Sequence, residues 1–167
     1  MKKTLLQRSH WIHPVIGFAL ALMIYGCRTP NDPDHPTDKS KETATYSADL
    51  ALKWSEMNLK LIRQSAGFTP PVASRALGYA GLTMYETVVP GIKSHRSLAG
   101  QLNGLKTLPQ PESGKEYHWA ASANAGQLFM AKNLWSNAPE AAQKTTDSLA
   151  AALRATFLAE SNAEIIE

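Results

Sequence analysis

The stretch Gly67–Gly91 constrains the fold of this chain most, because it predicts one long helix with almost no charge. Two prolines open the stretch and a third comes next to its end. Proline is tolerated in the first turn of a helix, where its missing N–H has no intrahelical partner, but a later proline stops the helix. Residues 72–89 carry only two formal charges, Arg75 and Glu86. A helix that is apolar nearly all round is either buried on every side or lies in a membrane.

The polar residues of this helix favour burial in protein over a lipid span. We therefore predict a central helix at about residues 71–89, wrapped by other helices. Small residues recur along it at three- and four-residue spacing, so a neighbouring backbone can approach closely; they are Ala73, Ala76, Ala80 and Gly81. Arg75 and Glu86 then each need a partner from elsewhere, because an unpaired buried charge is costly. We expect both to be structural anchors.

The charge of the chain excludes one class of partner. The formal net charge is +3, but Lys2, Lys3 and Arg8 lie among the first 26 residues, which contain no acid. The remainder has 14 Lys and Arg against 14 Asp and Glu. Without a basic stripe, nucleic acid is not an expected partner. The single cysteine, Cys27, excludes an internal disulfide framework and any site that needs several cysteines.

The first 26 residues have the pattern of a secretory signal: a basic start, an uncharged run at Val15–Tyr25 and a small residue, Gly26, before the break. As a helix that run would reach about 16 Å, which is too short to span a bilayer. Residues 24–27 resemble the lipobox of bacterial lipoproteins, so we expect lipidation at Cys27 and an exported protein held at a membrane, periplasmic or at the cell surface. An ordinary signal with an incidental cysteine is the alternative.

The rest of the chain divides into a linker and a helical domain. Residues 27–46 are rich in proline and charge, so they cannot bury enough apolar surface to fold and are expected to be flexible. Residues 47–167 predict an all-α bundle of about five to six helices around the central one. The expected segments are 48–65, the central helix, 98–105, 115–134, a helix after Pro139, and a sixth opened by Ser161. Because the sixth helix has barely begun at Glu167, we expect this domain to be incomplete at its C-terminus.

No constellation for catalysis or metal binding emerges from the residues themselves. The chain has no glycine-rich phosphate loop, no nucleophile elbow and no zinc-binding helix motif. His118, with Glu116 nearby, lacks a second ligand at the helical spacing that a metal would need. We therefore expect no catalytic, cofactor-binding or metal-binding residues in this chain.

A family resemblance rests on three phrases around the central helix. They are Gly67-Phe-Thr-Pro-Pro-Val-Ala-Ser-Arg75, Met84-Tyr-Glu-Thr-Val-Val-Pro-Gly91 and Ser97-Leu-Ala-Gly-Gln-Leu102. Together they resemble the N-terminal helical half of bacterial vanadium-dependent haloperoxidase-like proteins, of the type 2 phosphatidic acid phosphatase superfamily. The resemblance implies structural contacts for Arg75, Tyr85 and Glu86. It also implies a site for vanadate or a phosphate ester, made of basic residues and paired histidines in three blocks: Lys-x6-Arg-Pro, Pro-Ser-Gly-His and Ser-Arg-x5-His-x3-Asp. None of the three blocks occurs in this chain.

Three hypotheses for the function follow. The first is the N-terminal scaffold of a haloperoxidase-like or acid phosphatase-like protein, inactive without its catalytic half. Vanadate would then belong to the full-length protein, and the partner would be the missing half or a second copy. The second is a stand-alone helical lipoprotein that acts as a binding module. The third is an enzyme with an unrecognised site around His118, Glu116 and Arg75.

Overall fold

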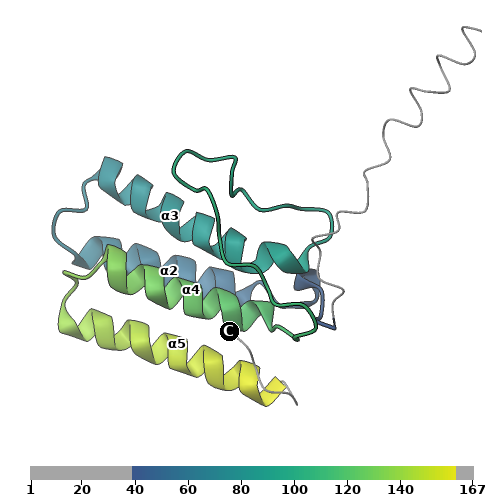
Figure 1. Cartoon of the computed structure of the whole chain (residues 1–167). Helices are drawn as coiled ribbons and strands as arrows, with labels where there is room; N and C mark the ends of the chain where they lie inside the picture. The colour runs from purple at the N-terminus through teal and green to yellow at the C-terminus, as the bar shows by residue number, and fades with distance from the viewer. Residues whose placement is uncertain (1–38, 161–167) are drawn as a thin grey trace, which may run out of the picture. The chain divides into compact units, whose positions relative to one another are not determined.

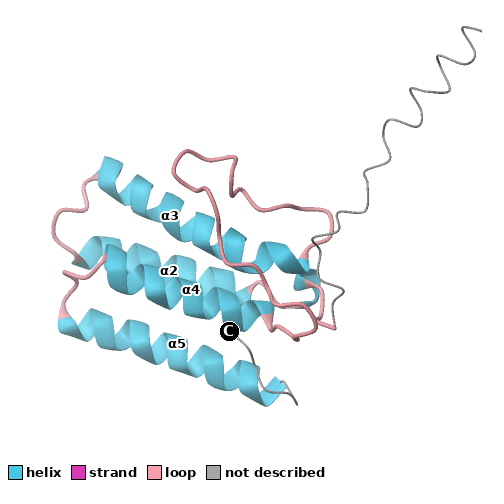
Figure 2. Ribbon diagram, in the orientation of Figure 1, coloured by secondary structure: helices cyan, strands magenta, loops and turns pink. Residues whose placement is uncertain are grey.

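The computed structural model describes residues 39–160, which form four α-helices and no strand (Figures 1 and 2). The all-α class predicted from the sequence is thereby confirmed. The elements are η1 (Thr43–Thr45), α2 (Asp49–Gln64), α3 (Pro70–Val88), η2 (Val89–Gly91), α4 (Trp119–Leu134) and α5 (Glu140–Glu160). The predicted signal, the lipidation site Cys27 and the sixth helix lie outside the described residues.

Within residues 39–160, helix α4 makes the most extensive contacts, with α3 and α5. It lies between α3 and α5, and α2 contacts all three (Figure 1). Its alanines let the neighbouring helices approach closely, and four of them are buried: Ala120, Ala121, Ala123 and Ala131. Larger side chains from the other helices complete the core, with Trp54 of α2 and Trp135, just after α4, at 0% and 1% exposure.

Helix α3 is not enclosed within the described chain, in contrast to the prediction of a helix wrapped on all sides. The only residues of α3 that are buried are Ala76 and Ala80. Val72 and Tyr79, which are seven residues apart and so share one side, are 44% and 49% exposed. The apolar sequence of this helix indicated burial, but residues 39–160 supply neighbours for only part of its circumference.

Two segments around α4 differ from the sequence predictions. Residues 98–105 form turns instead of a helix, because Gly100 and Gly104 take the left-handed φ values of 77° and 85°. Helix α4 begins at Trp119 instead of Lys115. The cause is His118, whose side chain accepts a hydrogen bond from the backbone N–H of Ala121 and so caps the helix.

The described end of the predicted linker, residues 39–46, lies against the helices. Thr43 Oγ1 donates a hydrogen bond to the carbonyl of Val88 at 2.8 Å, and Ser40 Oγ accepts one from the backbone N–H of Tyr117, also at 2.8 Å. The ring of Tyr46 packs partly buried against the core. A composition poor in apolar residues predicted a flexible segment here, but two hydroxyls and one aromatic ring attach it.

The two glycines Gly126 and Gly78 should respond oppositely to substitution by alanine. A Cβ at Gly126 would lie 2.9 Å from the Thr87 methyl and 3.1 Å from the Thr83 methyl. Thr87 cannot simply turn away, because its hydroxyl donates to the carbonyls of Thr83 and Met84. We expect Gly126→Ala to lower the free energy of unfolding by about 1–3 kcal/mol, the usual cost of overpacking.

Gly78→Ala is the matched control, because a Cβ there meets no atom within 4 Å. It should raise the free energy of unfolding by about 0.5–1 kcal/mol, the intrinsic preference of helices for alanine. Urea unfolding of both variants and the parent chain measures the difference. Stabilisation by both substitutions would contradict the close α3–α4 contact.

Candidate functional site

Two of the residues predicted as structural contacts, Tyr85 and Glu86, hold the long loop that follows α3. Glu86 Oε2 accepts a hydrogen bond from Ser97 Oγ, and Oε1 accepts one from the backbone N–H of Leu98, both at 2.7 Å. The Tyr85 hydroxyl donates to the carbonyl of Arg96 at 2.8 Å. These bonds bind the first part of the loop to the C-terminal half of α3.

Arg75, in contrast, is not a buried charge. Its side chain is exposed on the N-terminal half of α3, so water solvates the guanidinium and no protein partner is needed. The prediction of a partner rested on the expected enclosure of α3, which residues 39–160 do not provide at this part of the helix. Arg75 is also far along the bundle from His118: α3 and α4 run in opposite directions, and Ala80 is level with Gln127. Arg75 therefore lies beside the C-terminal half of α4, whereas His118 precedes its start.

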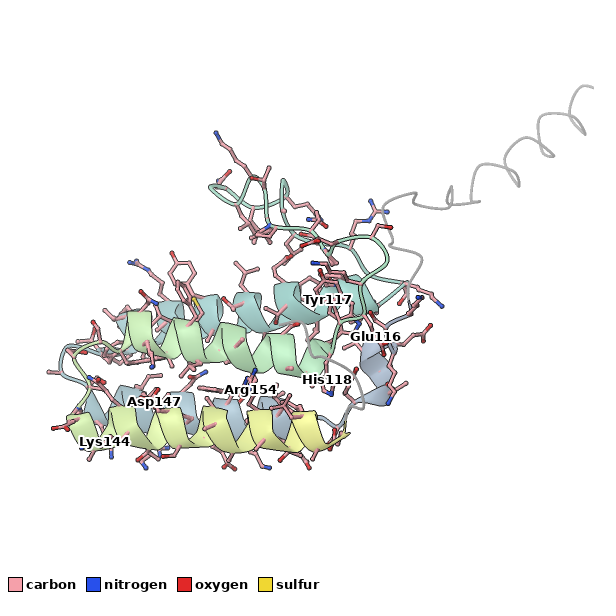
Figure 3. All side chains as sticks on the ribbon, turned by 60° about the horizontal axis from the view of Figure 1, so that its bottom comes forward. Glu116, Tyr117, His118, Lys144, Asp147 and Arg154 are labelled. Carbon is pink, nitrogen blue, oxygen red and sulfur yellow. The ribbon has the colours of Figure 1, made fainter. Side chains whose placement is uncertain are left out.

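A cluster of aromatic side chains surrounds His118 at the end of the bundle where α4 begins. The His118 ring lies 4.6 Å from the ring of Tyr46 and 5.0 Å from that of Phe157 of α5, between centroids. Its Nδ1 accepts the hydrogen bond from Ala121 N at 3.1 Å. Figure 3 shows Glu116, Tyr117 and His118 together at this end. The ring thus joins the N-terminal segment, α4 and α5.

Burial sets the protonation of this cluster. It lowers the pKa of His118 from the ordinary value of 6.5; a backbone hydrogen bond at His118 and the charge of Glu160 oppose this shift, and Lys41 adds to it. Burial also raises the pKa of Tyr46, with Glu116 and Glu160 adding to the shift. His118 is therefore a neutral ring whose Nδ1 is already used as a helix cap, which leaves this nitrogen no free lone pair for a substrate proton or a metal.

No other described residues form a recognisable catalytic or metal-binding set. Ser94 Oγ lies 2.9 Å from His95 Nδ1, but both residues are exposed neighbours in a loop, and no carboxylate among the described residues orients the ring. Within residues 39–160, no group of three or more His, Cys, Asp or Glu side chains could hold a metal ion.

Buried side-chain amides connect the helices, and the first of them is Asn124 of α4. Its Oδ1 accepts a hydrogen bond from the indole N–H of Trp54 at 3.0 Å, and its Nδ2 donates to the carbonyl of Ala150 at 2.9 Å. Asn124 therefore joins α2, α4 and α5 through one 5% exposed side chain.

The second amide, Gln127, lies one turn further along α4 and adds α3 to the network. Its Nε2 donates to the carbonyl of Ala80 at 2.8 Å, and its Oε1 accepts a long 3.4 Å hydrogen bond from Asn58 Nδ2 of α2. Oδ1 of Asn58 is buried without a hydrogen-bond partner among the described residues. An unpaired buried acceptor costs about 1–3 kcal/mol, so this amide of α2 is the weakest member of the network.

Sequence reasoning missed this network. The available signal was the pair Asn124 and Gln127, two amides three residues apart on a helix otherwise rich in Ala and Gly. Such a pair lies on one helix face, and buried amides need hydrogen-bond partners. The partners themselves, an indole on α2 and carbonyls of α3 and α5, carry no sequence signal.

Comparison with models of known protein families found no match, and comparisons with curated proteins and with solved structures found none either. None of the helices within residues 39–160 is long and apolar enough to cross a membrane. The assignment of a function therefore depends on the residues and their geometry.

Removing the Asn124 amide should destabilise the bundle strongly. Asn124→Ala leaves the buried Trp54 indole N–H without an acceptor and opens a small cavity, so we expect a loss of about 2–4 kcal/mol in the free energy of unfolding. Asn133→Ala is the control on the same helix: its Nδ2 donates to the carbonyl of Phe129, but the side chain is exposed. It should change the stability by no more than about 0.5 kcal/mol. Equal effects in chemical denaturation would show that the buried amide is not a structural link.

Proposed function

We propose that this chain is the N-terminal scaffold portion of an exported, vanadium-dependent haloperoxidase-like or acid phosphatase-like protein, and that it is not catalytic alone. The observation that carries the proposal is the uncovered apolar surface of α3, the helix that also bears most of the family resemblance. A scaffold helix of this kind requires further helices to bury it. In the proposed protein the catalytic half supplies them.

The uncovered surface is confined to the N-terminal half of α3. Residues 82–88 are partly buried, and the loop bound by Glu86 lies against this end of the helix. Towards the other end, Val72, Leu77 and Tyr79 are 44%, 38% and 49% exposed. The N-terminal half of α3 therefore exposes three large apolar side chains, together with Ser74 and Arg75.

Two glycines strengthen the case that this surface packs against another helix. Each glycine in a helix costs about 1 kcal/mol relative to alanine. The cost of Gly126 on α4 is explained by packing, because the threonines of α3 occupy the space that a Cβ would need. Gly78 and Gly81 have no neighbour within 4 Å of such an atom. A backbone that approaches them from outside the described bundle would offset their cost, as it does for closely packed helices.

In the proposed full-length protein, α3 becomes the central helix of a bundle of five to six helices. The described histidines are consistent with a supporting role. The histidines described are His95, exposed in a loop, and His118, engaged as a cap. The basic residues and histidines that would hold vanadate or a phosphate ester in the family belong to sequence blocks outside this chain.

A stand-alone helical lipoprotein that binds a partner is the second candidate. The observation that favours it is Phe129 on α4, which is 65% exposed. Because Gln127 is level with Ala80, Phe129 lies close along the bundle to the exposed Tyr79. Aromatic residues are enriched at protein–protein interfaces, so in this second candidate a partner protein or a second copy covers Phe129 and Tyr79.

The nucleotide sequence after the codon for Glu167 separates the two candidates. The scaffold proposal expects a continuation, in frame or frameshifted, that encodes the Pro-Ser-Gly-His block. We expect no vanadate-dependent bromination and no phosphatase activity from the purified chain, and one of these activities from the longer product. Several hundred unrelated bases would refute the scaffold proposal and leave the binding module.

In the longer product, Gly78→Leu should disrupt the proposed packing, because the glycine would contact a helix backbone there. The matched variant is Glu56→Leu, which adds the same side chain at an exposed position of α2. We expect the activity and the melting temperature to fall for Gly78→Leu and to change little for Glu56→Leu. Equal behaviour of the two variants would exclude close packing at Gly78.

We also propose that a lipid on Cys27 anchors the exported protein to a membrane, in the periplasm or at the cell surface. Two or three acyl chains give stable anchoring, whereas one chain alone is marginal. Cys27→Ser should therefore move the protein from the membrane fraction to the soluble exported fraction, measured by fractionation and immunoblotting. Unchanged fractionation would refute lipidation at this residue.

A further inference from the structure

We propose that His118 is an acid-sensitive latch that holds residues 39–46 against the start of α4, and that its protonation releases this segment. The proposal does not depend on the proposed function. It rests on the position of one ring, which caps a helix on one side and packs against the N-terminal segment on the other.

The hydrogen bond at Nδ1 requires a neutral ring. Nδ1 accepts from the backbone N–H of Ala121 at 3.1 Å, so the ring proton of the neutral form is on Nε2. Protonation places a second N–H against that of Ala121 and removes the cap. It also places a positive charge at the N-terminal end of α4, where the helix dipole disfavours cations. Protonation of His118 therefore destabilises the first turn of α4.

Residues 39–46 are attached to that same turn. The Tyr46 ring packs against His118 at 4.6 Å, and Ser40 Oγ accepts from the backbone N–H of Tyr117, the residue before the cap. Displacement of His118 and Tyr117 weakens both attachments together. Two contacts in the middle of the segment do not involve His118: the hydrogen bond from Thr43 to Val88 and the exposed ion pair of Glu42 with Lys93. Release is therefore partial: Ser40 and Tyr46 separate from the start of α4, while the middle of the segment and the bundle keep their contacts.

The charged groups around His118 favour release of this segment over release of α5. Lys41, on the segment, repels an imidazolium, whereas Glu160, at the end of α5, attracts it. Glu116, in the loop before α4, interacts with Tyr46. Protonation therefore works against the contact with the N-terminal segment, while the contact with Phe157 on α5 gains an electrostatic attraction.

The pH range follows from the direction of the shift. Burial lowers the pKa of His118 below 6.5 in the folded chain, so the unfolded or released state binds the proton more tightly. The stabilising contribution is complete above about pH 6.5. It is lost as the pH falls from there through the lowered pKa of the folded state.

Hydrogen exchange of the full chain, measured by mass spectrometry at about pH 7.5 and about pH 5, tests the latch. After correction for the intrinsic rate, we expect peptides covering residues 39–46 to lose protection severalfold in acid. His118→Asn keeps an acceptor for the cap but does not titrate, so its segment should retain protection. His95→Asn removes the other described histidine and should behave like the parent chain. An acid response of His118→Asn equal to that of the parent chain overturns the proposal.

A nuclear magnetic resonance titration of the unmodified chain provides a test that no variant can complicate. If His118 is the latch, the ring signals of Tyr46 change with the same midpoint as those of His118. Tyr46 signals that stay constant through the titration of His118 overturn the proposal.

Discussion

The structure depends on two side-chain amides of α4 that are buried among helices. Asn124 joins α2 to α5, and Gln127 joins α2 to α3. An apolar core of alanines would let α4 slide or turn against its neighbours, since such surfaces differ little from one register to the next. A buried amide fixes the register, because only one position gives each donor and acceptor a partner. Apolar packing supplies most of the stability, and the amides select one arrangement.

The small residues of α4 and the amides act together. Ala123 is fully buried and Gly126 leaves room only for the Thr83 and Thr87 methyls, so α3 comes close enough for Gln127 to reach the carbonyl of Ala80. A larger residue at position 126 would lengthen that hydrogen bond as well as create a clash. The hydrogen bond of Gln127 therefore requires the close approach of α3, and the small residues of α4 allow that approach.

The sequence predicted the helices well where the spacing of apolar residues and the positions of proline and glycine agreed. Prolines mark the start and end of α3, and the stripe of Leu50, Trp54, Met57 and Leu61 places α2 in the core. Within residues 39–160, however, α3 is not the enclosed helix that the sequence predicted. Apolar composition indicated α3, but burial depends on which helices are present to cover a surface, and local sequence does not contain that information. The cap at His118 was missed because histidine is rarely used as a helix cap. The attachment of Tyr46 was missed because its partner, His118, is distant in the sequence.

The exposed half of α3 is what connects the fold to a function. Tyr85 and Glu86 bind the loop to one half of the helix, so that half needs no further partner. The other half exposes Val72, Leu77 and Tyr79 and has two glycines, Gly78 and Gly81, with no neighbour within 4 Å of an added Cβ. Exposed large apolar side chains next to glycines with no neighbour are typical of a helix surface that packs against another protein surface.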